Sequence, residues 1–107
     1  MENPRFMARV FSASERDLFA HKKDPAPSFA ANFAAKEALS KALGTGVRGF
    51  ALNEVSVLRD SLGAPYFAFS GNAARIVEER GLSFSVSLTH TEDLAAAFVI
   101  AQPLPPG

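Results

Sequence analysis

A carboxylate and an ammonium group lie four residues apart on one predicted helix. The segment from Ser28 to Leu43 is rich in Ala, Phe, Leu, Lys and Glu and has no internal Gly or Pro, which predicts a long helix capped by Ser28. Glu37 and Lys41 are therefore neighbours on its surface. Such a pair usually stabilises a helix by only ~0.2–0.5 kcal/mol, but the same two groups could bind a hard divalent cation and a phosphate.

The rest of this helix separates into two arcs at about 100° per residue. One arc holds Lys36, Ser40, Phe33, Glu37 and Lys41, and the opposite arc holds Ala35, Ala38, Leu39 and Ala42. We expect the apolar arc to face the core and the first arc to lie opposite it.

Three glycines follow the helix and spell G-x-G-x-x-G at Gly44, Gly46 and Gly49. In a dinucleotide-binding fingerprint these glycines follow a strand and open a helix, whose N-terminus receives the pyrophosphate. Here they come after the end of a helix, so we predict a helix stop and a loop. The N–H groups of a loop that begins at Gly44 could still contact a phosphate.

A histidine closes a predicted strand near the other end of the chain. Phe84, Val86 and Leu88 alternate with polar residues, which predicts a strand with one face turned inward. His90 is then either a turn residue that bonds to backbone or an imidazole that binds a ligand. The residues alone leave both interpretations open.

Composition limits the class of protein that can use these groups. The chain has 107 residues, of which 48% are hydrophobic and 21% charged, with no Cys. We expect one folded domain over residues 1–107, without disulfides or thiolate metal sites. Eleven basic residues balance eleven acidic ones, so no overall field favours nucleic acid or an anionic membrane.

No targeting or membrane-spanning segment is evident in the sequence. The longest apolar run, from Leu94 to Ala101, has eight residues, whereas a transmembrane helix needs ~20. The N-terminus lacks the apolar stretch of a signal peptide. We therefore expect a cytoplasmic protein that does not enter a membrane.

The remaining elements position these groups within an α+β arrangement. A capping box formed by Ser12 and Glu15 opens a predicted helix that runs to Lys23. Beyond the long helix we predict strands at 54–59 and 65–69 joined by a turn at 60–63, a helix at 70–80, strands at 84–89 and 94–101, and a frayed tail at 103–107.

Three segments, taken together, resemble the holo-acyl-carrier-protein synthases, which are small 4′-phosphopantetheinyl transferases. They run from Phe33 to Gly46, from Gly63 to Tyr66 and from Val86 to Thr91, in the family's order. The resemblance implies an antiparallel sheet packed against a long helix. It also implies transfer of 4′-phosphopantetheine from coenzyme A to a serine of apo acyl carrier protein, with release of 3′,5′-ADP, in fatty-acid biosynthesis.

The resemblance also implies roles for residues of the long helix. Glu37 matches the family's Mg²⁺ ligand, and Lys41 matches a lysine that handles charge near the pyrophosphate. Lys36 matches a neighbouring lysine of the motif and, with Lys41 and Gly44, is expected to bind coenzyme A. Glu37 and Lys41 are the residues expected to act in catalysis.

Other parts of the resemblance place the nucleotide end of coenzyme A and the carrier protein. His90 and Thr91 match residues near the 3′-phosphate, and the turn with Gly63 and Pro65 matches the region near the adenine.

The protein partner is expected at the basic N-terminal part of the chain. Through Arg48 the chain has eight basic and five acidic side chains, against three and six in the remainder, which suits an acidic carrier protein. Arg5 and Arg9 are our candidates for binding it. Family members of this size resemble homotrimers whose active sites form between subunits.

The sequence departs from the family's pattern in two places. The family's N-terminal strand carries Gly-x-Asp, whose aspartate is a second metal ligand, and only Met1 and Glu2 stand in that region here. Asn32 stands where the family commonly has an arginine. An alternative to the enzyme is therefore a non-catalytic module that binds coenzyme A or the carrier without a metal site.

Overall fold

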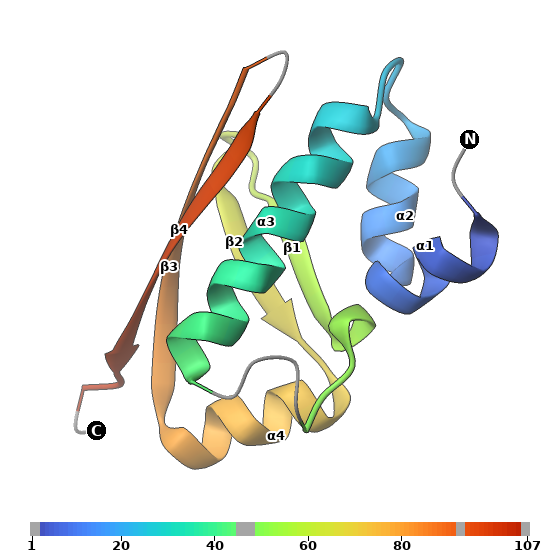
Figure 1. Ribbon diagram of the computed structural model, residues 1–107. Coiled ribbons are helices and arrows are strands. Elements are labelled where there is room, and N and C mark those ends of the chain that lie inside the picture. Colours follow the sequence, from blue (N-terminus) through green and yellow to red (C-terminus); the bar gives the residue numbers. More distant parts are fainter. Residues whose placement is uncertain (1–2, 45–48, 92–93, 106–107) are drawn as a thin grey trace.

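The computed structural model describes residues 3–44, 49–91 and 94–105. Within these ranges, helices and two strand pairs follow one another along the chain (Figure 1). Their bounds are α1 Pro4–Val10, α2 Ala13–Ala20, α3 Ala26–Leu43, the 3₁₀ turn η1 Leu52–Glu54, β1 Val55–Arg59, β2 Pro65–Phe69, α4 Gly71–Arg80, β3 Leu82–His90 and β4 Ala95–Pro103. The fold class is α+β, as predicted.

The first two helices begin at side-chain caps. The Asn3 side chain accepts the N–H groups of Arg5 and Phe6, and Pro4 occupies the first helical position of α1. This helix is absent from our sequence prediction, although Asn followed by Pro is a helix-start signal. The capping box predicted at Ser12 and Glu15 is present in α2, but the helix ends at Ala20, three residues earlier than predicted.

The long helix α3 begins two residues before the predicted start. Its N-cap is Pro25, which makes no side-chain bond, so the assignment of Ser28 as the cap is wrong. Proline in a first turn loses no hydrogen bond, because the first N–H groups of a helix have no partner inside it. Gly44 ends α3 in the left-handed region with φ of 75°, which confirms the predicted helix stop.

Two antiparallel hairpins provide the strands. Val55 pairs with Phe69 and Arg59 with Pro65 in β1–β2, and the connecting turn is held by Asp60, whose side chain accepts two backbone N–H groups. In β3–β4, Leu82 pairs with Pro103. The predicted fraying at 103–107 is wrong for its first two residues, because Pro103 is paired and the Leu104 N–H bonds to the Gly81 carbonyl at 2.7 Å.

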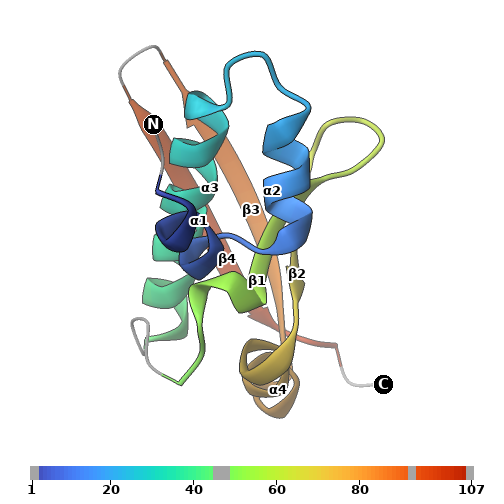
Figure 2. The ribbon, with the colours of Figure 1, turned by 90° about the vertical axis from the view of Figure 1, so that its right-hand side faces the viewer.

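Helix α3 runs through the middle of the molecule and separates its other parts. The β3–β4 hairpin lies along one side of α3, and α1 and α2 lie on the other (Figures 1 and 2). The β1–β2 hairpin lies behind α3, and α4 lies across its C-terminal end. In the described residues the strands form two two-stranded antiparallel sheets, β1–β2 and β3–β4.

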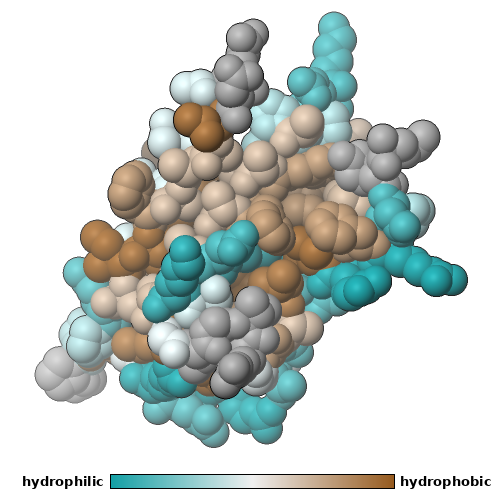
Figure 3. All heavy atoms as spheres, in the orientation of Figure 1, coloured by the Kyte–Doolittle hydropathy of each residue, from teal (hydrophilic) through white to brown (hydrophobic). Residues whose placement is uncertain are grey.

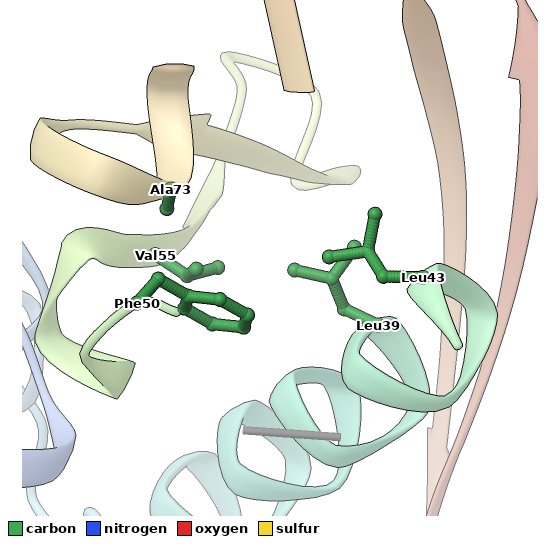
Figure 4. Packing of buried hydrophobic residues seen from close by; sticks show 5 residues of the cluster. All are labelled: Leu39, Leu43, Phe50, Val55 and Ala73. Carbon is green, nitrogen blue, oxygen red and sulfur yellow. The ribbon is translucent and has the colours of Figure 1, made fainter. Parts of the chain in front are cut away.

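Two apolar clusters pack against α3. Leu39 and Leu43 point toward Phe50, Val55 and Ala73, so the C-terminal half of α3 is joined to β1 and α4 (Figure 4). A second cluster contains Val10, Phe11 and Phe19, with Phe29 of α3 packed against it. Edge and stacked ring contacts of 4.5–5.9 Å between centroids connect its three phenylalanines. These clusters fix the position of α3 from both ends.

Among the described helices, none combines the length and the hydropathy needed to span a lipid bilayer.

Candidate functional site

The ammonium group of Lys36 lies inside the protein. Lys36 is only 1% exposed, and its Nζ donates to Glu15 Oε1 at 2.6 Å. It also bonds to the carbonyl oxygens of Val10, Leu52 and Val55 at 2.6–2.9 Å. Burial lowers the pKa of Lys36, and the charge and hydrogen bond of Glu15 oppose that shift. With four oxygen partners, Lys36 is not accessible to coenzyme A, which corrects the role implied by the resemblance.

Glu15 is the buried counterpart of Lys36 and joins two helices to β1. Its Oε1 accepts the Ser12 N–H at 3.0 Å, and its Oε2 accepts Asn32 Nδ2 at 2.9 Å and the Val57 N–H at 3.2 Å. A buried charge needs a partner and hydrogen bonds, and this carboxylate has both. The expectation that Lys36 and Ser40 lie away from the core is therefore wrong, because Glu15 and main-chain carbonyls supply polar partners inside.

Arg59 extends the same network toward the surface. Its Nη2 donates to Asn32 Oδ1 at 2.9 Å, and its Nη1 makes longer contacts of 3.4 and 3.3 Å with the carbonyls of Val57 and Leu58. Burial lowers the pKa of the half-buried guanidinium, while the Glu15 charge raises it. Asn32 thus links an interior carboxylate to a partly exposed cation.

The opposite face of α3 presents Glu37 and Lys41 to solvent. Both residues are exposed, and the Glu37 carbonyl accepts the Ser40 hydroxyl at 2.8 Å. Across the described ranges, Lys36–Glu15 is the only ion pair, so Glu37 and Lys41 do not neutralise each other. Glu37 and Lys41 thus do not form the surface ion pair that their spacing would allow, and both charges are available to a ligand.

Two cavities meet at His90, beside the first turns of α3. One, of about 220 Å³, is lined by Gly63 and Pro65 of the β1–β2 turn, by His90, and by the basic residues Lys22 and Arg59. The other is lined by His90, Thr91, Asp24 and Ala30 among others. The structure thus brings together four residues that the resemblance assigns to the nucleotide: Gly63, Pro65, His90 and Thr91.

Glu37 and Lys41 lie further along the same face of α3. Ala30, which lines the second cavity, is within about 20° of both residues around the helix axis at 100° per residue. Seven residues separate Ala30 from Glu37, which is a rise of about 10 Å. The exposed charges and the two cavities therefore share one side of the molecule.

The other predicted site residues are more scattered. The Gly44 N–H donates to the Lys41 carbonyl at 3.0 Å as part of the helix cap, so it is not available for a phosphate. Gly46 lies outside the described residues. Arg5 and Arg9 are both exposed on α1, on the far side of α3 from the β3–β4 hairpin (Figure 1).

The donors on the surface of α3 agree with a magnesium ion held in part by substrate. No group of three or more metal-ligating side chains gathers within the described part of the chain. An exposed glutamate offers hard oxygen donors, and Mg²⁺ commonly takes one or two carboxylates together with waters and substrate phosphates. Glu37 fits such an ion as its protein ligand.

Sequence reasoning overlooked three residues of the site. Arg59 and Lys22 line the cavity beside His90, and Glu15 bonds to Asn32, which in turn accepts a hydrogen bond from Arg59. The only sequence signals were a capping-box glutamate and a basic residue just before a turn. Neither signal indicates a ligand, because Glu15 and Arg59 meet through Asn32, which is distant from both in sequence.

The fold agrees with the comparisons with known proteins. The chain belongs to the 4′-phosphopantetheinyl transferase superfamily, whose model matches residues 1–99.

Among the curated relatives are proteins named holo-[acyl-carrier-protein] synthase. Those of Myxococcus xanthus and Aromatoleum aromaticum are 46% and 48% identical to this chain over 105 and 99 residues. The alignments cover 95% and 92% of this chain and 82% and 79% of the relatives.

Solved structures of synthases have the same fold. The holo-[acyl-carrier-protein] synthase of Neisseria meningitidis matches with a TM-score of 0.87 and 34% identity, over 94% of this chain and 82% of that one. The Helicobacter pylori synthase in complex with coenzyme A matches with a TM-score of 0.78 and 29% identity, over 92% and 82%.

Proposed function

We propose that this protein is a holo-acyl-carrier-protein synthase, which moves 4′-phosphopantetheine from coenzyme A to a serine of apo acyl carrier protein. The observation that carries the proposal is the convergence of Gly63, Pro65, His90 and Thr91 on adjoining cavities next to the exposed charges of α3. Family membership and the names of the relatives support the same activity. The non-catalytic alternative gains no support from them.

The nucleotide end of coenzyme A binds in the cavities beside His90 in this proposal. The turn with Gly63 and Pro65 receives the adenine, and His90 and Thr91 lie near the 3′-phosphate. The pyrophosphate then extends along α3 toward Glu37 and Lys41. This direction agrees with the rise of about 10 Å between Ala30 and Glu37.

The reaction requires a phosphoryl group to pass between two oxygens. The serine oxygen of the carrier bonds to the phosphorus next to pantetheine, the bridging P–O bond breaks, 3′,5′-ADP leaves and the serine proton is released. The protein's part is positioning and charge stabilisation. Lys41 stabilises the negative charge that develops on the leaving phosphate.

Glu37 would hold Mg²⁺ against the pyrophosphate. A bound Mg²⁺ supplies Lewis-acid neutralisation of the phosphate oxygens. Because Glu37 is exposed and has no ion-pair partner among the described residues, its carboxylate is available for that role.

The acidic carrier protein binds the exposed basic side chains of α1, with Arg5 and Arg9 as contacts. This interaction is electrostatic at a surface, so it should weaken as ionic strength rises. We also place the protein in the cytoplasm and in fatty-acid biosynthesis, in line with the class of carrier that it modifies.

A homotrimer agrees with the exposed apolar face of the molecule. Figure 3 shows a largely apolar surface over α3 and β4. The exposed large side chains of the described residues include Phe98 and Ile100 of β4 and Leu94 just before it, which are 70%, 58% and 74% exposed. Exposed apolar patches commonly mark subunit interfaces. Sedimentation equilibrium should give three times the chain mass, and Phe98→Glu should give the monomer mass.

The activity is tested by incubating the chain with apo acyl carrier protein, coenzyme A and Mg²⁺. Mass spectrometry should show the carrier gaining phosphopantetheine, with equimolar 3′,5′-ADP. A reaction in which EDTA replaces Mg²⁺ should give no product. If the chain binds coenzyme A but no carrier is modified, the non-catalytic binding module is supported and the proposed transferase activity is contradicted.

A further inference from the structure

We propose that Arg59 is a phosphate-binding residue of the cavity beside His90, and that Asn32 positions its guanidinium there. The inference rests on the proposed function, because it identifies the bound group as the 3′-phosphate of coenzyme A. Arg59 would then be one source of the preference for coenzyme A over its 3′-dephospho form.

The cavity has the charge that such a group requires. Three basic side chains line it from separate parts of the chain: Lys22 before α3, Arg59 at the end of β1 and His90 at the end of β3. No carboxylate is among its described lining residues, and Ser28 adds a hydroxyl. Two cations and an imidazole that converge on a cavity without a carboxylate in its described lining favour an oxyanion, and arginine binds phosphate oxygens through two parallel N–H groups.

Asn32 has one orientation in this network. Its Nδ2 donates to Glu15 Oε2 at 2.9 Å and to the Val57 carbonyl at 3.0 Å. Both amide hydrogens are thereby used on acceptors in the interior, so the amide oxygen must face the other way. It accepts Arg59 Nη2 at 2.9 Å.

The guanidinium keeps donors for a ligand after these bonds. A guanidinium has five N–H donors, and Arg59 makes one short contact, to Asn32, and two contacts of 3.3 Å or longer to carbonyls. The side chain is thus held in place before a ligand arrives. This preorganisation lowers the entropic cost of binding.

The arrangement also bears on the departure at position 32. The resemblance places an arginine where this chain has Asn32. Here a guanidinium reaches the Asn32 side chain from β1 instead. The cation is therefore supplied by a different element, and the asparagine holds it.

Calorimetric titration of the full chain with coenzyme A and with 3′-dephospho-coenzyme A tests the proposal. The unmodified chain should bind coenzyme A more tightly than the dephospho form. Arg59→Gln should weaken coenzyme A binding by roughly tenfold to a hundredfold and change binding of the dephospho form by less than about threefold. Arg75→Gln removes an exposed guanidinium from α4 and should change neither affinity.

Positioning by Asn32 has its own measurement. Asn32→Ala keeps Arg59 but removes the amide oxygen that accepts its Nη2 hydrogen bond. The preference for coenzyme A over the dephospho form should then lie between the values of the unmodified chain and Arg59→Gln. Arg59→Lys keeps the charge without the paired N–H groups and should also give an intermediate preference. Circular dichroism shows whether Arg59→Gln folds. If it does not, the test uses Arg59→Lys and the same quantity, the ratio of its affinities for coenzyme A and 3′-dephospho-coenzyme A.

The two levels of the proposal fail in different ways. An unmodified chain that binds no coenzyme A would contradict the proposed function. An unmodified chain that binds it, with the same preference in folded Arg59→Gln or Arg59→Lys, would contradict the role of Arg59 alone.

Discussion

Two neighbours on α3, Lys36 and Glu37, occupy opposite environments. The Lys36 ammonium is buried and bonded to Glu15 and three carbonyls, whereas the Glu37 carboxylate is exposed and forms no ion pair among the described residues. A step of about 100° around the helix separates them.

The difference shows that one motif serves two purposes. Lys36 fastens α3 to α2 and β1, so that the helix has one position. Lys36 thereby also fixes the position of Glu37, whose carboxylate forms no ion pair within the described ranges. The buried face should therefore determine stability, and the exposed face should determine activity.

The largest expected effect is on the buried side. Lys36→Met leaves the Glu15 carboxylate inside without its cation, which should lower the free energy of unfolding by about 3–5 kcal/mol. Lys41→Met, on the exposed face of the same helix, should change it by less than about 0.5 kcal/mol. Urea unfolding followed by circular dichroism compares the two, and equal effects would contradict the division between the faces.

Substitutions on the exposed face of α3 should change the activity and leave the stability unchanged. Glu37→Gln should slow phosphopantetheine transfer by about a hundredfold or more, because it removes the proposed metal ligand. Its free energy of unfolding should stay within about 0.5 kcal/mol of the unmodified chain. Glu79→Gln, which removes an exposed carboxylate of α4, is the matched control and should alter neither quantity. Loss of folding in Glu37→Gln would show that the carboxylate is structural.

A smaller effect is expected where the buried network meets a helix cap. Ser12→Ala removes the hydroxyl that accepts the Glu15 N–H at 3.2 Å and the Ser56 hydroxyl at 2.7 Å. The free energy of unfolding should fall by about 1 kcal/mol. Ser14→Ala, at an exposed position in the first turn of α2, is the control. If both variants unfold at the same urea concentration, the cap contributes nothing measurable.

The smallest expected effect concerns the partly exposed Glu54 and depends on pH. Glu54 accepts the N–H groups of Ala51 and Asn72 at 3.0 and 3.1 Å, which lowers its pKa below the ordinary value of 4.5. A carboxylate with a lowered folded-state pKa adds stability above its unfolded-state pKa and loses it as the pH falls through the folded-state value. The stability advantage over Glu54→Gln should therefore be steady near pH 7 and shrink below pH 4.5. An advantage that stays constant from pH 7 to pH 3 would contradict this.

Much of the fold could be predicted because its signals are local. The extended pairs β1–β2 and β3–β4, the stop of α3 at Gly44 and the capping box of Ser12 all follow from residues close together in sequence. The start of α3 was misjudged, since Ser28 has the right side chain for a cap but two prolines set the first turn instead.

The candidate site could be predicted only in part. Motif resemblance identified Gly63, Pro65, His90 and Thr91, and the structure brings them to adjoining cavities. Lys36 was assigned to the ligand because it matches a lysine of the family's motif. Its actual partner is Glu15, 21 residues earlier, and nothing in the local spacing indicates that pairing.

The amino-acid sequence by itself determined every α-helix of the described residues except α1, together with the hairpins and the family, because periodicity, caps and motifs are properties of nearby residues. Only the tertiary structure decided which charges are buried and which remain available. Lys36, Asn32 and Arg59 take their roles from Glu15, from β1 and from one another. The physical reason is that a buried charge is stable only beside its partners, and folding brings those partners from distant parts of the chain.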